Sequence, residues 1–169
     1  MKKTWLITGA SRGFGRIWAD AALKRGDQVA VTARQLADVA DFGARFGDAA
    51  LPLALDVTNA EQVEQAVQEA YGRFGRMDVL VNNAGTSLVA ATEEASDEQI
   101  RGLFDANYLG MVRVIRAALP LLRKQGGGHI LGVSSGLGIT ASPLIGFYCA
   151  RSRSPEGAGD RSSASSRAK

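Results

Sequence analysis

The sequence has one cysteine, one histidine and few aromatic residues, and each scarcity excludes a class of protein. With Cys149 alone, an internal disulfide framework is excluded, which fits a reducing cytoplasm. The one histidine, His129, reads as an exposed residue at the start of a strand, and we expect no metal site. Apolar runs are too short to span a bilayer, and the stretch after residues 1–3 is too short for a signal peptide. We therefore expect a cytoplasmic protein with no membrane partner.

An excess of one charge is also missing from most of the chain. The net charge of +3 suggests a basic protein, but residues 1–150 carry 15 basic and 15 acidic residues. The whole excess lies in residues 151–169, which carry five basic and two acidic residues. We therefore expect no nucleic-acid partner.

Short apolar runs alternate with segments of helical periodicity along residues 1–150. The runs predict buried strands over 5–8, 29–32, 51–55, 79–81 and 129–134. The periodic segments predict helices over 14–25, 36–46, 60–74 and 96–124, with caps at Asn59 and Ser96. Asn107 and Gly110 should interrupt the last helix, and Pro120 should kink it. This alternation predicts an α/β fold with right-handed crossovers and a parallel sheet covered by helices on both faces.

The composition changes abruptly after Ala150. Residues 151–169 contain six serines and no aliphatic residue larger than alanine. Such a segment cannot bury enough apolar surface to offset its ordering entropy, so we expect a disordered tail. The predicted domain is residues 1–150.

The first predicted strand runs into a glycine-rich turn that opens a helix. Gly9 permits a tight turn, Gly13 keeps side-chain bulk away from a pyrophosphate, and Gly15 permits close packing of the helix. The helix N-terminus then directs its free amides and its positive dipole at phosphate groups. The spacing differs from Gly-x-Gly-x-x-Gly, so an ordinary glycine-rich turn remains an alternative at this point.

Further motifs follow this turn at characteristic positions. They are Thr8-Gly9-x-x-x-Gly13-x-Gly15, Asp56, Asn82-Asn83-Ala84-Gly85, Asn107, Ser135 and Tyr148. In order and spacing, residues 1–150 resemble the short-chain dehydrogenase/reductase family, over about the first three-fifths of a typical member. Taken singly, the asparagines read as turn residues or a helix irregularity, and Ser134 and Ser135 as strand-end caps.

The resemblance implies a doubly wound sheet of five strands in the order 3-2-1-4-5, lacking the last two strands of the family. It also implies a role for each motif. The cofactor would lie against Gly9, Ser11, Arg12, Gly13, Phe14, Gly15, Arg34, Asp56, Val57, Asn83, Ala84 and Gly85. Within this set, Asp56 would hydrogen-bond the adenine. Among the catalytic residues, Ser135 would orient the substrate oxygen, Tyr148 would exchange a proton with it, and Asn107 would hold a water of the proton relay. The implied reaction is hydride transfer between a nicotinamide and a small alcohol or carbonyl substrate; homo-oligomer formation is left open.

Charge at the end of the second predicted strand bears on the choice of cofactor. An acidic residue there would select NAD by binding the ribose 2′-hydroxyl, but the chain has Ala33 followed by Arg34. Together with Arg12, Arg34 could clamp a 2′-phosphate. NADP(H) is therefore the expected cofactor, unless Arg34 is simply a solvated loop residue.

The family pattern fails after Tyr148. The family continues Tyr-x-x-x-Lys, in which the lysine holds the ribose and lowers the tyrosine pKa, but Ser152 stands at the lysine position. An abrupt Ser/Arg/Gly/Ala segment after an intact match suggests a truncated or frameshifted product. The expected function is that of an oxidoreductase whose activity is impaired by loss of this lysine and of the family's C-terminal third. The alternatives are a non-catalytic nucleotide-binding or oligomerisation module and a truncated product without function.

Overall fold

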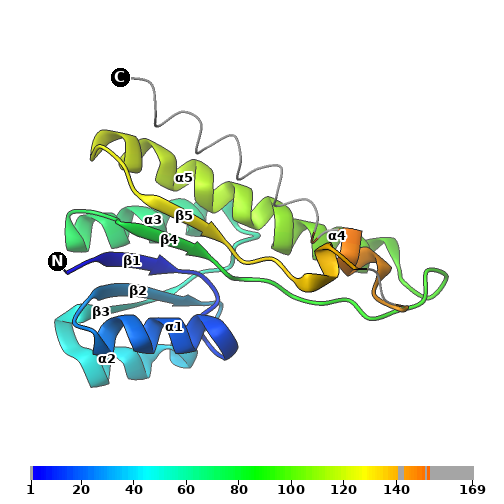
Figure 1. The fold of residues 1–169 in the computed structure, drawn as a ribbon, viewed down its shortest axis with the longest axis horizontal. Coiled ribbons are helices and arrows are strands. Elements are labelled where there is room, and N and C mark those ends of the chain that lie inside the picture. Colours follow the sequence, from blue (N-terminus) through cyan, green and yellow to red (C-terminus); the bar gives the residue numbers. More distant parts are fainter. Residues whose placement is uncertain (1, 141–142, 151, 153–169) are drawn as a thin grey trace.

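The protein is a three-layer α/β structure in a computed structural model that describes residues 2–140, 143–150 and 152 (Figure 1). Its strands are β1 (Thr4–Ile7), β2 (Gln28–Ala33), β3 (Ala50–Ala54), β4 (Val79–Asn82) and β5 (His129–Gly132). All neighbouring pairs are parallel, and the order is β3-β2-β1-β4-β5. The predicted fold class and strand order are confirmed.

Helices cover both faces of this sheet (Figure 1). One face carries α1 (Gly13–Lys24) and α2 (Ala40–Phe46), and the other carries α3 (Ala60–Phe74) and α5 (Gly110–Lys124). The remaining elements are α4 (Asp97–Phe104) and the short turns η1 (Leu36–Asp38), η2 (Gly47–Ala49), η3 (Asp105–Leu109) and η4 (Gly136–Gly138). Right-handed crossovers in a parallel sheet place the helices on these two faces.

Two of the helices start at the predicted caps. The Asn59 side chain accepts a hydrogen bond from Gln62 N at 3.0 Å at the start of α3. At the start of α4, Ser96 Oγ accepts from Gln99 N at 3.2 Å, and Gln99 Oε1 accepts from Ser96 N at 2.9 Å. The second pair is a complete capping box, which satisfies two backbone donors that the helix leaves open.

Two predicted helices are divided in the structure. The segment 36–46 consists of η1 followed by α2, because Val39 is buried in a non-helical conformation between them. The segment 96–124 consists of α4, the π-helical turn η3 and α5. The predicted interruption near Asn107 is thus confirmed, while α5 continues through Pro120. The strand predicted over 129–134 ends earlier, at Gly132.

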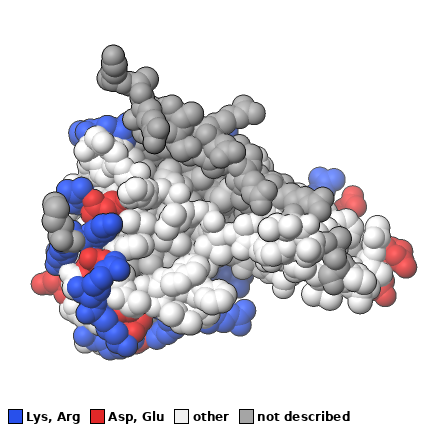
Figure 2. All heavy atoms as spheres, viewed as in Figure 1, with Lys and Arg blue, Asp and Glu red and all other residues white. Residues whose placement is uncertain are grey.

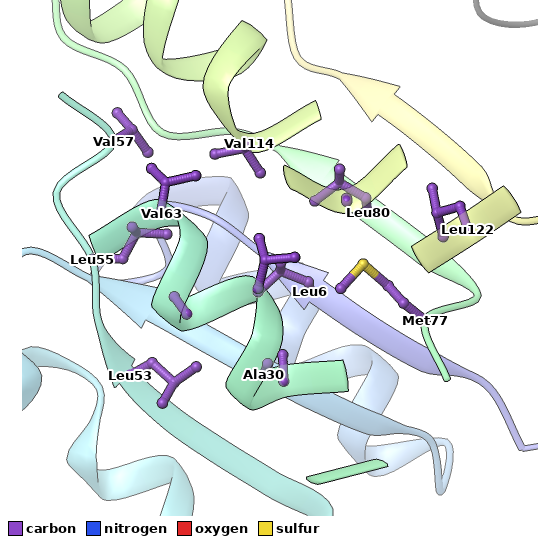
Figure 3. Packing of buried hydrophobic residues seen from close by; sticks show 14 residues of the cluster. Leu6, Ala30, Leu53, Leu55, Val57, Val63, Met77, Leu80, Val114 and Leu122 are labelled. Atoms are coloured by element: carbon purple, nitrogen blue, oxygen red, sulfur yellow. The ribbon is translucent and has the colours of Figure 1, made fainter. Parts of the chain in front are cut away.

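The core is split by the sheet into two apolar layers. Figure 3 shows the layer under α3 and α5, where Leu6, Val63, Leu80 and Val114 are buried against one another. The opposite layer packs α1 and α2 on β1, β2 and β4 through Phe42, Val29, Val31, Ile7 and Val81, among others. Burial on both faces explains why these strands read as continuous apolar runs rather than alternating ones.

The carboxyl-terminal part of the described chain is more exposed. Within the described residues β5 pairs with β4 alone, and both His129 and Leu131 are exposed. Residues 146–150 and Ser152 are helical, and Cys149 is buried there. Helical structure therefore passes the predicted boundary at Ala150. The predicted disorder of the tail concerns residues that otherwise lie outside the described part.

Candidate active site and cofactor-binding loop

A network of hydrogen bonds joins the loop after β1 to the loop after β4. The Thr8 hydroxyl donates to Val81 O at 3.3 Å and accepts from Asn83 N and Ala84 N, both at 3.0 Å. In return, Asn83 Nδ2 donates to Thr8 O at 3.0 Å and to Gly9 O at 2.9 Å. These bonds fix two cofactor-binding candidates, Asn83 and Ala84, against the glycine-rich turn at the carboxyl ends of the central strands.

The three glycines of this turn serve different geometric needs. Gly9 has φ +69°, and a Cβ built there would lie 2.7 Å from Ala84 Cα. A Cβ on Gly15 would lie 2.5 Å from both Gly9 O and Asn83 Nδ2, so α1 packs closely on the loop itself. Gly13 has φ +61° and open space where its Cβ would point. The open space at Gly13 leaves room for a pyrophosphate to approach the backbone, so the residues here fit such a group.

The residues at the N-terminus of α1, directly after the glycine-rich turn begins, are largely exposed. Arg12 occupies the N-cap in an extended conformation without a side-chain cap, and the first turn carries no acidic residue. Arg12 and Phe14 are exposed, and Ser11 is half-buried. The amide groups of the first turn therefore have neither an acidic neighbour nor a capping side chain, as an anion site at a helix N-terminus requires.

Asp56 and Arg34 lie at the carboxyl ends of β3 and β2. The Asp56 carboxylate accepts from Thr58 N at 2.9 Å and from Thr58 Oγ1 at 2.7 Å. The backbone hydrogen bond from Thr58 is the main cause that lowers the pKa of Asp56; burial opposes it, and the Thr58 hydroxyl and the charge of Arg34 lower it further. Arg34 is exposed at the end of β2, on the same edge of the sheet as Asp56 and at the predicted adenosine end.

Val57 lies beside Asp56, but its side chain is buried. A Cβ on Gly110 would lie 2.7 Å from Val57 Cγ2, so the start of α5 packs directly on this residue. Val57 O accepts a hydrogen bond from Arg113 Nη1 at 3.4 Å. A cofactor contact from Val57 would therefore come from its backbone N–H rather than from its side chain.

Asn107 sits in the π-helical turn between α4 and α5 and is buried. Its side chain donates to Thr86 O and accepts from Thr86 N, both at 2.7 Å. The pair joins the interrupted helix to the loop after Gly85, itself an exposed candidate. Thr86 could not be predicted as a site residue, because a residue that contributes only its backbone to a contact leaves no mark in its side-chain type.

The candidate catalytic residues Ser135 and Tyr148 lie on two segments that a hydrogen bond joins. Ser134 Oγ donates to Ser152 O at 2.8 Å, which holds the end of the Tyr148 helix against the segment after β5. Ser135 Oγ accepts from Leu137 N at 3.3 Å, and Tyr148 is half-buried. The Ser152 side chain is fully buried and its hydroxyl donates to Tyr148 O at 2.8 Å, so the position of the family lysine is turned inward.

Asn82, the first residue of the Asn82-Asn83-Ala84-Gly85 motif, has a feature that the sequence does not predict. The amide of Asn82 is buried at the end of β4, and neither its nitrogen nor its oxygen has a hydrogen-bond partner in the described structure. Thr32 Oγ1 in β2 is also buried without a hydrogen-bond partner in the described structure.

Among the described residues, no group of His, Cys, Asp or Glu is placed to hold a metal ion. No helix in the same residues is long and apolar enough to cross a bilayer.

These features define an α/β domain of the doubly wound class with a glycine-rich turn at the carboxyl ends of its central strands. The sequence profile of the short chain dehydrogenase family matches residues 3–152. The chain belongs to this family.

Individual relatives agree with the family match. The chain is 44% identical over 149 residues to "Oxidoreductase BOA17" of Botryotinia fuckeliana, covering 88% of this chain and 54% of that protein. It is 39% identical over 152 residues to a "3-ketodihydrosphingosine reductase" of Bacteroides thetaiotaomicron, covering 90% and 54%. The chain thus spans about half the length of the curated relatives it matches.

Solved structures share the fold closely. A short-chain dehydrogenase from Streptomyces avermitilis superposes with a TM-score of 0.91 at 38% identity, over 97% of this chain and 62% of that one. ElxO with NADP bound gives 0.90 at 29% identity, over 98% and 68%. A relative from Burkholderia phymatum in complex with NAD gives 0.89 at 26% identity, over 95% and 58%. Both cofactors therefore occur among the neighbours.

Proposed function

We propose that the protein is an NADP(H)-dependent oxidoreductase of the short-chain type, acting between a nicotinamide and an alcohol or carbonyl compound in the cytoplasm. The observation that carries the proposal is the glycine-rich turn itself, which has open space at Gly13, is held by the Thr8–Asn83 hydrogen bonds and leads into a helix N-terminus without a side-chain cap. The reductase activity in the name of the Bacteroides relative supports a carbonyl substrate.

NADP(H) is favoured over NAD(H) by charge. Arg12 and Arg34 are both exposed at the side where the adenosine ribose would lie, and Ala33 stands where an acidic residue would select NAD. Guanidinium groups bind phosphate with two parallel hydrogen bonds, which suits a 2′-phosphate. The negative charge of Asp56 near Arg34 opposes this preference.

The proposed chemistry assigns one role to each candidate residue. When bound, the nicotinamide would give or take the hydride. The Tyr148 hydroxyl would give a proton to the carbonyl oxygen, the Ser135 hydroxyl would orient that oxygen, and buried Asn107 would hold a water of the proton relay. Hydride and proton together convert the carbonyl to an alcohol, and the reverse transfer oxidises the alcohol.

Ser152 favours a second function for this polypeptide, cofactor binding without turnover. Serine carries no charge, and the Ser152 hydroxyl is bound to Tyr148 O in a fully buried position. This position therefore supplies no cation to the ribose or to Tyr148. Measurement of both properties on the purified chain separates the alternatives. Turnover of NADPH with aldehydes or ketones supports the enzyme, binding without turnover supports a nucleotide-binding module, and neither supports a product without function.

Association between copies of the chain is the proposed quaternary behaviour. Leu131 on β5 is 51% exposed, and the outer edge of this strand offers backbone groups for pairing. Light scattering at micromolar concentration should detect species larger than one chain, and a stable monomer would contradict the proposal.

A further inference from the structure

The two segments that follow β4 and β5 lack charged residues over unusual lengths. Residues 79–92 contain no Asp, Glu, Lys, Arg or His, and neither do residues 130–150. Charged residues make up 22% of the whole chain, so an uncharged run of 21 residues departs clearly from the composition elsewhere. These segments contain or adjoin the candidate catalytic residues Ser135 and Tyr148 and the Asn107 partner Thr86.

Direct contacts bring the two segments together. Ala90 N donates a hydrogen bond to Leu144 O at 2.8 Å. Leu144 has φ +63°, in the left-handed region that a leucine rarely adopts. Such a conformation persists only where surrounding structure enforces it, and it is concentrated at ligand-binding sites. The strained residue lies four positions before Tyr148 in the sequence.

Several large apolar side chains on these segments are exposed. Val89 is 67% exposed, Leu144 57% and Ile139 79%. Figure 2 shows that the part of the molecule projecting beyond the sheet has a broad uncharged area, with acidic residues at its far end and a basic group beside an acidic one on its upper edge. Sequence places Glu93 and Glu94 just beyond the uncharged segment, and Glu94 is held there by Ala91 N at 3.2 Å. An anionic substrate would therefore meet apolar side chains and, at the rim, like charge.

We infer that the substrate of this site is an uncharged, largely apolar ketone or aldehyde, recognised through Val89, Ile139 and Leu144. The inference rests on the proposed function for the reacting carbonyl, but its selectivity is a property of these loops. Covering apolar side chains with a hydrocarbon stabilises the complex in proportion to the area removed from water. Moving a carboxylate or phosphate onto the same surface loses hydration that no cation in 79–92 or 130–150 replaces.

A matched pair of ketones tests the inference directly. Binding of 2-octanone and of 7-oxooctanoate, which differ in the terminal carboxylate, is measured by ligand-observed NMR on the full chain with and without NADPH. We expect 2-octanone to bind roughly tenfold more tightly or better. In the double variant Val89→Lys/Ile139→Lys the preference should fall or reverse, because two cations then face the carboxylate. The variant Ile17→Lys, 60% exposed on α1, should keep the parental preference.

The outcomes separate the two levels of the argument. Equal binding of both ketones, binding of neither, or a preference unchanged in the double variant would overturn the inference. A double variant that alters the mass of an assembly but not ketone binding would also overturn it, since the loops would then be an interface between copies. NADPH titration reports independently on the proposed function, because the loop substitutions lie outside the glycine-rich turn.

Discussion

The side chain of Asn83 is bound through its amide nitrogen to the backbone of Gly9, 2.9 Å from the carbonyl oxygen. The same nitrogen donates to Thr8 O at 3.0 Å. One residue after β4 thereby satisfies two carbonyl groups of the turn after β1. A cofactor loop that contains three glycines has little intrinsic rigidity, and this asparagine supplies part of it.

The first prediction replaces this donor without changing its shape. Asn83→Asp removes both donated hydrogen bonds and sets a carboxylate against two carbonyl oxygens. We expect a loss of about 2–3 kcal/mol of unfolding free energy and weaker NADPH binding. The control is Asn59→Asp, because Asn59 accepts rather than donates at its helix cap and aspartate caps equally well. Urea denaturation and fluorescence titration measure both effects; equal behaviour of the two variants would contradict the role of Asn83.

The second prediction contrasts two buried threonines, Thr32 in β2 and Thr8 in the loop directly after β1. Thr32 Oγ1 is buried without a partner in the described structure, so Thr32→Val should stabilise the protein by about 1 kcal/mol. Thr8 Oγ1 makes three hydrogen bonds, so Thr8→Val should destabilise it by about 2–4 kcal/mol. Opposite shifts of the urea midpoint are expected. A destabilised Thr32→Val would indicate that its hydroxyl has a partner in solution, such as a buried water.

The third prediction concerns acid stability. Asp27 is buried and accepts from Lys3 N at 2.9 Å, from Trp5 Nε1 at 2.9 Å and from Arg25 Nε at 3.1 Å. Burial acts to raise the pKa of Asp27, but these donors outweigh it, and the net pKa lies below the usual 3.8. A depressed folded pKa gives stability that is complete above about 3.9, the unfolded value, and is lost as the pH falls through the folded value.

The variant Asp27→Asn checks the sign. It should lose about 1–3 kcal/mol at neutral pH, and the difference from the parent should shrink as the pH is lowered below about 4. Chemical denaturation at pH 7, 5 and 3.5 supplies the three values. A difference that stays constant over this range would show that the charge of Asp27 contributes nothing.

The fourth prediction tests cofactor choice. Arg34→Asp should weaken NADPH binding by roughly 10- to 100-fold, because one charge-assisted hydrogen bond contributes about 1.5–3 kcal/mol. The variant should then bind NADH more tightly than NADPH. Arg116→Asp on the exposed side of α5 changes the net charge equally and should leave the order unchanged. Equal affinities of the parent chain for NADH and NADPH would refute the arginine clamp.

Local signals in the sequence were sufficient for the strands and for the caps at Asn59 and Ser96, since these depend on periodicity and on side chains a few residues apart. The strand order followed from the resemblance to a doubly wound family. The division of 96–124 into α4, η3 and α5 depends on the bond between Asn107 and the backbone of Thr86, 21 residues away, so its form could not be read locally. The inward orientation of the Ser152 hydroxyl could not be predicted either, because it depends on the hydrogen bond to Tyr148 O. Polar residues at strand ends were located correctly, but which of them bind each other is a tertiary property.

The last prediction concerns catalysis by the chain as it stands. General acid–base assistance is worth about 10² to 10⁴-fold, so loss of the lysine that assists Tyr148 should cost a comparable factor. The Ser152 position is 0% exposed, and Ser152→Lys must bury an ammonium group there or displace the helix that carries Tyr148. We therefore expect little NADPH-dependent turnover from the parent chain and little recovery from Ser152→Lys alone. The chain covers 54% of the Botryotinia relative, and a chimera with the remaining segment of that protein plus Ser152→Lys should recover activity, because further structure could then support the lysine and enclose the substrate. The assay is oxidation of NADPH followed at its absorbance with a series of ketones and aldehydes, and Tyr148→Phe in each background is the blank. Tyr148-dependent turnover by the parent chain at roughly 1 s⁻¹ or more, an ordinary enzymatic rate, would show that neither the lysine nor the additional segment is required.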